Sequence, residues 1–390
     1  MTKKFAVLQF IYWFLFCTAY SFANPVLSSK GFSVSNIGII LSLSAFLSVI
    51  TQPLLAKLIN KYNRISNRLI LIFSMISLLL MLILSIVIKN NIVLTIIYIL
   101  ILSNILNTQT FIYTFIFDYI NNGYEINFGL TRGTGSIAFA IASLGLGYIT
   151  KFYGFSFIIY LELLLTVLII FMIFSFNSND IVKEVKLNKE YKGNIFTFVK
   201  KYKKFTWFLL GIMCIFTTHM AINNFFLNIM QSVGKGTMFV GIGLAIAAIL
   251  ELPVMASYKH IKRKFGSYNI LFFAIISFTI KSFIVLIGLM FNSVSIILLS
   301  QVSQIFAFAI YLPTAIHYVN DVMEKEDRVK GQAYLGSAGT ISSIIASYIG
   351  ARIIENQGVT YMVLFITVIS LVGTVIVCKN LERIKNEKNT

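Results

Sequence analysis

Twelve long apolar runs dominate the 390-residue chain, and they constrain its fold more than any other feature. A run of about 20 apolar residues is long enough to cross the hydrocarbon core of a bilayer as a helix. A transmembrane β-barrel needs short alternating segments, whereas these runs are continuous, so they predict helices. The predicted spans are residues 5–27, 34–58, 68–88, 92–119, 130–150, 155–176, 205–230, 236–258, 269–291, 294–319, 332–352 and 359–379.

The composition excludes an ordinary soluble enzyme and a disordered chain. Hydrophobic residues make up 58% of the sequence and charged residues 12%, whereas soluble domains have about 45–50% and about 25%. The first apolar run is longer than the apolar region of about 7–15 residues in a secretory signal, so we expect it to be retained as the first span. Cys17, Cys214 and Cys378 lie in or beside apolar runs without paired spacing, and we interpret them as buried thiols.

Positive charges predict the orientation of the spans. The formal net charge is +18, and with both termini inside the cell, 26 of the 32 Lys and Arg residues fall on the cytoplasmic side and five on the opposite side. Because cytoplasmic loops of membrane proteins carry the excess of Lys and Arg, we expect a cytoplasmic-membrane protein with both termini in the cytoplasm. The basic charge then reflects topology and attraction to anionic lipid, and we expect no nucleic-acid partner.

A polar stretch divides the chain into two halves of six spans. Residues 177–204 carry eight Lys against three acidic residues, and short segments recur at an offset near 200, as in 53–56 and 253–256. Two six-helix halves in the same orientation are typical of transporters with a solute site near the midplane between them. The predicted domains are an N-terminal bundle (1–176), a basic cytoplasmic linker (177–204), a C-terminal bundle (205–379) and a cytoplasmic tail (380–390).

Several segments resemble the major facilitator superfamily. They are the basic loop at 56–64, the segment 128–136 that enters the fifth span, Glu251-Leu252-Pro253 in the eighth span, and segments 317–319 and 332–335. The chain is most similar to the branch that contains lactose permease and the phenylpropionate and nucleoside permease-like proteins. This resemblance implies an alternating-access carrier built from two pseudo-symmetric six-helix halves.

Ionisable residues within the spans are the candidate proton-coupling groups. A charged side chain at the centre of a span costs about 2.5–3.5 kcal/mol, so each one needs a partner, water or a function. Glu251 and Lys281 lie in the middle of neighbouring spans, where they would form either a proton switch or a static ion pair. Asp118 and Arg132 are close enough in sequence to meet across a turn. His219 would relay protons, or it would be a hydrogen-bonded core residue.

One further acidic residue lies in a span. Glu162 is the lone acid of the sixth span, and it would face a cavity, the lipid or the outer interface. Each of these positions implies a different role, and the pattern of the sequence does not decide among them.

The resemblance also implies substrate-binding positions. In the resembling permeases an arginine at the position of Arg132 contacts solute, so Arg132 would bind solute or would anchor its helix at the cytoplasmic boundary. A tryptophan at the position of Phe139 stacks on sugar in these permeases. Thr114 matches a sugar-binding glutamate, and Gln304 lies near a coupling histidine. Helices one, four, seven and ten line the cavity of this family, and their amides and aromatic rings add Asn24, Asn107, Asn223, Asn224 and Tyr311 as candidates.

Energy would come from an ion gradient or from the solute's own gradient. The sequence contains no GxxxxGK[ST] segment, no plausible Ser/His/Asp set and no metal-ligand cluster, so we predict no enzyme, no nucleotide hydrolysis and no cofactor. The predicted function is proton symport of a sugar, a nucleoside or an aromatic acid. An efflux antiporter, a uniporter and a non-transporting membrane receptor on the same fold stay open as alternatives.

Overall fold

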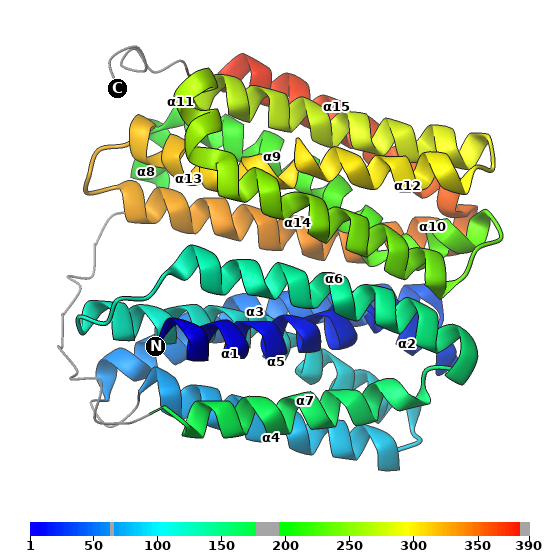
Figure 1. Ribbon diagram of the computed structural model, residues 1–390. Helices are drawn as coiled ribbons and strands as arrows, with labels where there is room; N and C mark the ends of the chain where they lie inside the picture. Colours follow the sequence, from blue (N-terminus) through cyan, green and yellow to red (C-terminus); the bar gives the residue numbers. More distant parts are fainter. Residues whose placement is uncertain (63–65, 177–194, 383–390) are drawn as a thin grey trace. The chain divides into compact units, whose positions relative to one another are not determined.

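The computed structural model describes residues 1–62, 66–176 and 195–382, and all regular structure in these ranges is helical (Figure 1). Eleven helices of the described residues are long and apolar enough to cross a membrane. A bent pair near the start, Thr2–Ser21 with Ala23–Ser29, passes the same test together and makes the twelfth candidate. The predicted class, an all-α membrane protein with twelve transmembrane helices, is confirmed.

The first compact unit comprises Met1–Lys189. Within it α1 packs along α6 and α7, and α5 packs along α3 and α4. Its core includes a cluster of aromatic rings in which Phe5 of α1 lies 4.5 Å from Phe176 and 5.2 Å from Tyr119, measured between ring centroids. The elements are α1 (Thr2–Phe16), η1 (Cys17–Ser21), α2 (Ala23–Ser29), α3 (Val34–Lys61), α4 (Asn67–Val87), α5 (Asn91–Asn121), α6 (Phe128–Tyr153) and α7 (Ser156–Phe174).

The second compact unit comprises Glu190–Thr390. Within it α9 packs along α15 and α14, and α11 packs along α12, α13 and α15. The elements are α8 (Ile195–Lys201), α9 (Lys203–Asn224), α10 (Phe226–Ser232), α11 (Thr237–Met290), α12 (Val294–Val302), η3 (Ser303–Ile305), α13 (Phe308–Val322), α14 (Arg328–Gln357) and α15 (Val359–Asn380). Most of the predicted linker and tail, residues 177–194 and 383–390, lies outside the described residues, and the described end of the linker contains α8.

Polar residues at the ends of the apolar runs start several of the helices. The Ser33 hydroxyl caps α3, the Ser66 hydroxyl caps α4, the Asn90 side chain caps α5 and the Asn127 side chain caps α6, each by accepting a backbone N–H of the first turn. Such caps satisfy donors that the helix itself leaves unpaired. The predicted starts of these four spans, 34, 68, 92 and 130, therefore agree with the structure to within about two residues, whereas the ninth span begins at His260 and not at 269.

Three spans are broken inside the apolar runs. The first contains the π-helical turn η1 and bends by 47° before α2. The span 203–232 breaks at Phe225 between α9 and α10, and the span 294–322 breaks at η3 between α12 and α13. Conversely, α11 is two spans joined end to end, because Gly266 adopts φ 71°, a left-handed conformation that favours glycine.

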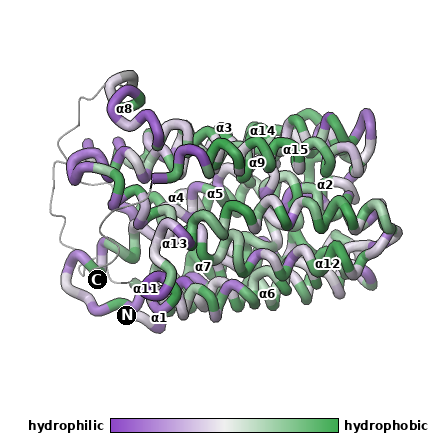
Figure 2. The backbone as a smooth tube through the Cα atoms, turned by 90° about the horizontal axis from the view of Figure 1, so that it is seen from above, coloured by the Kyte–Doolittle hydropathy of each residue, from purple (hydrophilic) through white to green (hydrophobic). Residues whose placement is uncertain are grey.

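Apolar residues extend along the helices, and hydrophilic residues gather at their ends and in α8 (Figure 2). Many large apolar side chains are exposed, among them Val87 (70%), Phe171 (69%) and Met290 (71%). A soluble protein rarely exposes so much contiguous apolar surface, whereas a bilayer solvates it. Cys17 is buried as predicted, but Cys214 and Cys378 are only half-buried, and all three are free thiols.

An ionic contact outside the spans ties α8 to the loop before α14. The Lys201 Nζ lies 2.6 Å from a carboxylate oxygen of Glu324 and 2.8 Å from one of Asp327. The Tyr202 hydroxyl also donates to Asp327, at 3.0 Å. These bonds, that from Lys201 above all, lower the pKa of Asp327 below its ordinary value.

Candidate functional site

Three side chains of the second unit are linked by two hydrogen bonds. The Lys281 ammonium donates to the Gln304 carbonyl oxygen over 2.9 Å, and the Gln304 amide nitrogen donates to the Glu251 carboxylate over 3.2 Å. Lys281 is 1% exposed, Gln304 is buried and Glu251 is half-buried. The expected opposite charges thus lie in one network, and Gln304 bridges them. We call Glu251, Gln304 and Lys281 the relay.

The break in the tenth span holds the middle member of the relay. Gln304 lies in the single 3₁₀ turn η3, and the backbone leaves helical geometry at Ala307, where ψ is −93°. A 3₁₀ turn is tighter than an α-helix and often marks a functional hinge. Glu251 and Lys281 come from the two spans of α11, on either side of Gly266. Three separate spans therefore supply the relay.

His219 lies in an aromatic surround in the same unit. Its ring stacks on Phe308 with an interplanar angle of 12° and contacts the edges of Phe216 and Phe278. One ring nitrogen, Nε2, lies 3.2 Å from the Asn223 amide nitrogen. The other, Nδ1, is buried and has no hydrogen-bond partner among the described residues. An unpaired buried polar atom costs free energy, so this nitrogen is a candidate contact for solute or water.

The other predicted positions of the second unit separate into different roles. Tyr311 is 3% exposed, and its ring packs on Phe216 with centroids 4.9 Å apart, so it belongs to the aromatic surround of His219. Asn223 faces His219, whereas Asn224 donates to the Ser347 hydroxyl at 2.9 Å and joins α9 to α14. Adjacent asparagines thus lie on different faces of α9.

Arg132 forms the centre of a second polar group, in the first unit. Its guanidinium carbon lies 4.0 Å from the ring centroid of Trp13, and one nitrogen donates to the Ser136 hydroxyl at 3.1 Å. The Trp13 N–H in turn donates to the Gln9 side chain at 3.0 Å. The guanidinium lies on the indole face, whereas Asp118 accepts from the Asn67 amide, so a meeting of Arg132 with Asp118 across the turn stays a prediction.

Close packing holds the indole in place. A Cβ on Gly135 would overlap the Trp13 ring, so only glycine fits there. The Phe139 ring meets the indole edge to face at 6.4 Å, and Phe139 is half-buried. A planar cation on an aromatic face is a platform for a flat or anionic solute. We call Gln9, Trp13 and Arg132 the indole–guanidinium platform.

The remaining predicted positions of the first unit bond mainly within the protein. Asn107 accepts from the Ser48 hydroxyl at 2.8 Å and donates to the Thr51 hydroxyl at 2.7 Å, which joins α5 to α3. Asp118 accepts from the Asn67 amide at 2.7 Å. Asn24, which is 3% exposed, accepts from Ser28 of its own helix, and the exposed Thr114 donates to its own helix. Their roles in substrate or proton binding stay predictions.

Two members of the platform were not predicted from the sequence. Trp13 is one of only two tryptophans, and it lies four residues after Gln9, which places both on one face of α1. Gln9 is fully buried, and a buried glutamine in an apolar span is a signal that sequence inspection could have used. The partner on α6 is 119 positions away, and only the folded chain shows it.

The arrangement defines a class of protein. Apolar spans in two units, broken helices, and buried charged groups within the spans are features of secondary transporters. The sequence matches the MFS_1 like family over residues 3–366, so the chain belongs to that family. It is a multi-pass membrane transporter of the major facilitator type, and the family resemblance seen in the sequence is confirmed.

Solved structures share the fold at low sequence identity. A mutant of the nucleoside transporter NupG has a TM-score of 0.80 at 15% identity, covering 98% of this chain and 100% of that one. The D-xylose-proton symporter has 0.73 at 12%, covering 99% of both chains. A POT family transporter in complex with 5-aminolevulinic acid has 0.75 at 12%, covering 99% and 96%. No curated protein matches the sequence significantly.

Proposed function

We propose that this transporter couples the movement of a small organic solute to the movement of protons. The relay is the observation that carries the proposal. A carboxyl and an ammonium that share one bridging amide influence each other's charge, because protonation of Glu251 changes what Gln304 accepts and donates. Gain or loss of one proton on Glu251 would therefore rearrange bonds on three spans.

The platform of the first unit and the aromatic rings around His219 in the second unit are each a candidate contact for the solute. The guanidinium of Arg132 suits an anionic or hydroxyl-rich group, and the aromatic rings around His219 suit a flat ring. A sugar, a nucleoside or an aromatic acid has this chemistry. The structural relatives support the choice, since one is named as a nucleoside transporter and another as a D-xylose-proton symporter.

The orientation follows from the charges. The 26 Lys and Arg residues assigned to one side, against five on the other, favour the cytoplasmic membrane with both termini in the cytoplasm. Solute uptake would then be driven by the inward proton gradient.

External pH in lightly buffered, de-energised cells tests the proposal directly. Sugars, nucleosides and aromatic acids are added one at a time to cells that make the protein. We expect alkalinisation with one class of solute, and its loss in Glu251→Gln. Glu355→Gln, which neutralises an exposed acid of α14, is the matched control and should respond as the wild type.

Other outcomes identify the alternatives. Exchange of labelled solute with no pH change would favour a uniporter. Acidification on solute addition would favour an antiporter. Neither solute exchange nor a pH change across the panel would favour efflux of another compound or a receptor. Wild-type alkalinisation in Glu251→Gln would exclude this carboxyl as the coupling site.

A further inference from the structure

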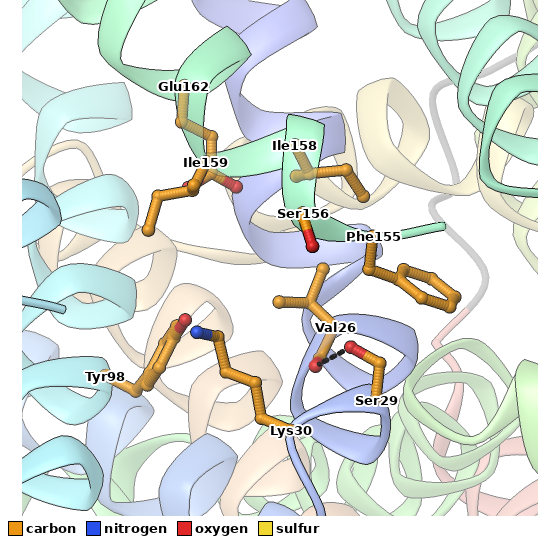
Figure 3. Close-up of a pocket in the computed structure, with 9 residues that line it drawn as sticks. All are labelled: Val26, Ser29, Lys30, Tyr98, Phe155, Ser156, Ile158, Ile159 and Glu162. Carbon is orange, nitrogen blue, oxygen red and sulfur yellow. Dashed lines mark hydrogen bonds between the residues drawn. The ribbon is translucent and has the colours of Figure 1, made fainter. Parts of the chain in front are cut away.

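A polar cavity lies in the first unit, and none of the platform residues lines it. Its volume is about 270 Å³, and it opens between the end of α2 and the start of α7. Its wall contains an acid, a base and a phenol, Glu162, Lys30 and Tyr98, with Ser29 and Ser156 beside them (Figure 3). Because a water molecule occupies about 30 Å³ of liquid, the space holds a solute of several non-hydrogen atoms.

Glu162 provides an unpaired carboxyl at the inner end. The residue is 6% exposed, and no hydrogen bond or ion pair reaches its carboxylate among the described residues. Figure 3 shows its side chain pointing from α7 into the space that Lys30, Tyr98 and Ser156 also border. A buried carboxylate without a partner is costly, so this position calls for a bound cationic group.

The opposite end of the cavity attracts an anion. Helix α7 has 19 residues, and no side chain caps its N-terminus. Its first residues, Ser156 and Ile158, line the cavity, so the positive end of the helix dipole faces it. The Lys30 ammonium also lines the cavity, beside the buried Tyr98, whose ring centroid lies 6.0 Å away.

The two ends are separated along one helix. Ser156 and Glu162 are six residues apart, which is about 9 Å along the axis at 1.5 Å per residue. The side chain of Glu162 leans back towards the N-terminus of its helix, as helical side chains do, and this shortens the gap. The spacing exceeds the reach of an α-amino acid and suits charged groups at the two ends of a short carbon chain.

We propose that this cavity binds a small water-soluble zwitterion, with its ammonium on Glu162 and its acid group between Lys30 and the N-terminus of α7. The preferred ligand carries its two charges several carbons apart. This site does not rest on the proposed proton coupling, because it shares no residue with the relay or the platform.

Isothermal titration calorimetry on the purified full-length chain in detergent tests the proposal. The ligands are glycine, β-alanine and 4-aminobutyrate, with butyrate and butylamine as single-charge controls. We expect 4-aminobutyrate to bind best, and at least tenfold more tightly than butyrate or butylamine. Glu162→Gln and Lys30→Met should each weaken its binding at least tenfold.

Matched variants make the result specific. Glu125→Gln and Lys89→Met remove exposed charges of the same types in the same unit, and both should bind as the wild type. Lys30 is exposed, so Lys30→Met keeps the test valid if Glu162→Gln fails to fold. Wild-type binding in both cavity variants, equal binding of the single-charge controls, or no heat with any zwitterion would overturn the proposal.

Discussion

Replacing Gln304 with leucine isolates the energetic contribution of the relay. The Gln304 carbonyl accepts the Lys281 ammonium over 2.9 Å, and Lys281 is 1% exposed, so water cannot replace the lost acceptor. Leucine is close to glutamine in volume, and the packing should change little. A hydrogen bond to a charged group contributes about 1.5–3 kcal/mol, so we expect Gln304→Leu to lower the free energy of unfolding by about 2 kcal/mol.

Gln301 provides the matched control three residues earlier in the same span. It is also 1% exposed, but its amide makes only a 3.4 Å bond to the neutral Ser300 hydroxyl. Gln301→Leu should therefore cost less than about 1 kcal/mol. The assay is equilibrium unfolding of the purified variants in mixed micelles with increasing SDS, followed by circular dichroism.

A double variant tests the mechanism of the loss. Adding Lys281→Met to Gln304→Leu removes both polar partners, and such a replacement is nearly neutral when the shapes are kept. The double variant should therefore be less destabilised than the sum of the two single variants. Equal losses for Gln304→Leu and Gln301→Leu, or strict additivity in the double variant, would refute the reasoning.

Two further predictions concern packing and pH. Gly135→Ala should destabilise the first unit by about 1–3 kcal/mol, because the added Cβ overlaps the Trp13 ring. Gly145→Ala is the control, since no atom lies within 4 Å of its added Cβ, and it should not destabilise the unit. Thermal unfolding of the two variants compares these effects. The pKa of the Asp327 carboxyl is lowered in the folded chain. The ionised carboxyl therefore stabilises the fold above the pKa of the unfolded chain, and this stabilisation is lost as the pH falls below about 4, through the pKa of the folded chain. Lys201→Met should move this loss to higher pH in unfolding titrations, and an unchanged profile, or an equal shift in the exposed Lys200→Met, would contradict the assignment.

Local sequence signals predicted most of the fold. Each apolar run has the length of a span, and residues such as Ser33, Ser66 and Asn127 end the loops by capping the next helix. The breaks within spans were not predicted, because the residues around Phe225 and η3 include no Gly or Pro that would mark the end of a helix. Their geometry depends on packing against neighbouring helices, which the local pattern does not contain.

The sequence likewise predicted some residues of the candidate site but not their contacts. Glu251 and Lys281 can be identified from the sequence alone, because a charged side chain within an apolar run is costly and therefore rare. The sequence did not predict two contacts: the Arg132 guanidinium lies on Trp13, and the amide of Gln304 stands between Glu251 and Lys281. Contacts between distant segments depend on which helix faces meet, and a face is defined only when the helices pack.

The sequence by itself therefore determined the class of the protein, its number of spans and its short list of buried charges, because hydrophobic length and charge act locally along the chain. Only the tertiary structure decided which of those charges share a network. It also decided that Glu162, for which the sequence left lipid, interface and cavity open, lines a cavity together with Lys30. Such contacts form between helices that lie far apart in the sequence, so their partners emerge only from the packed bundle.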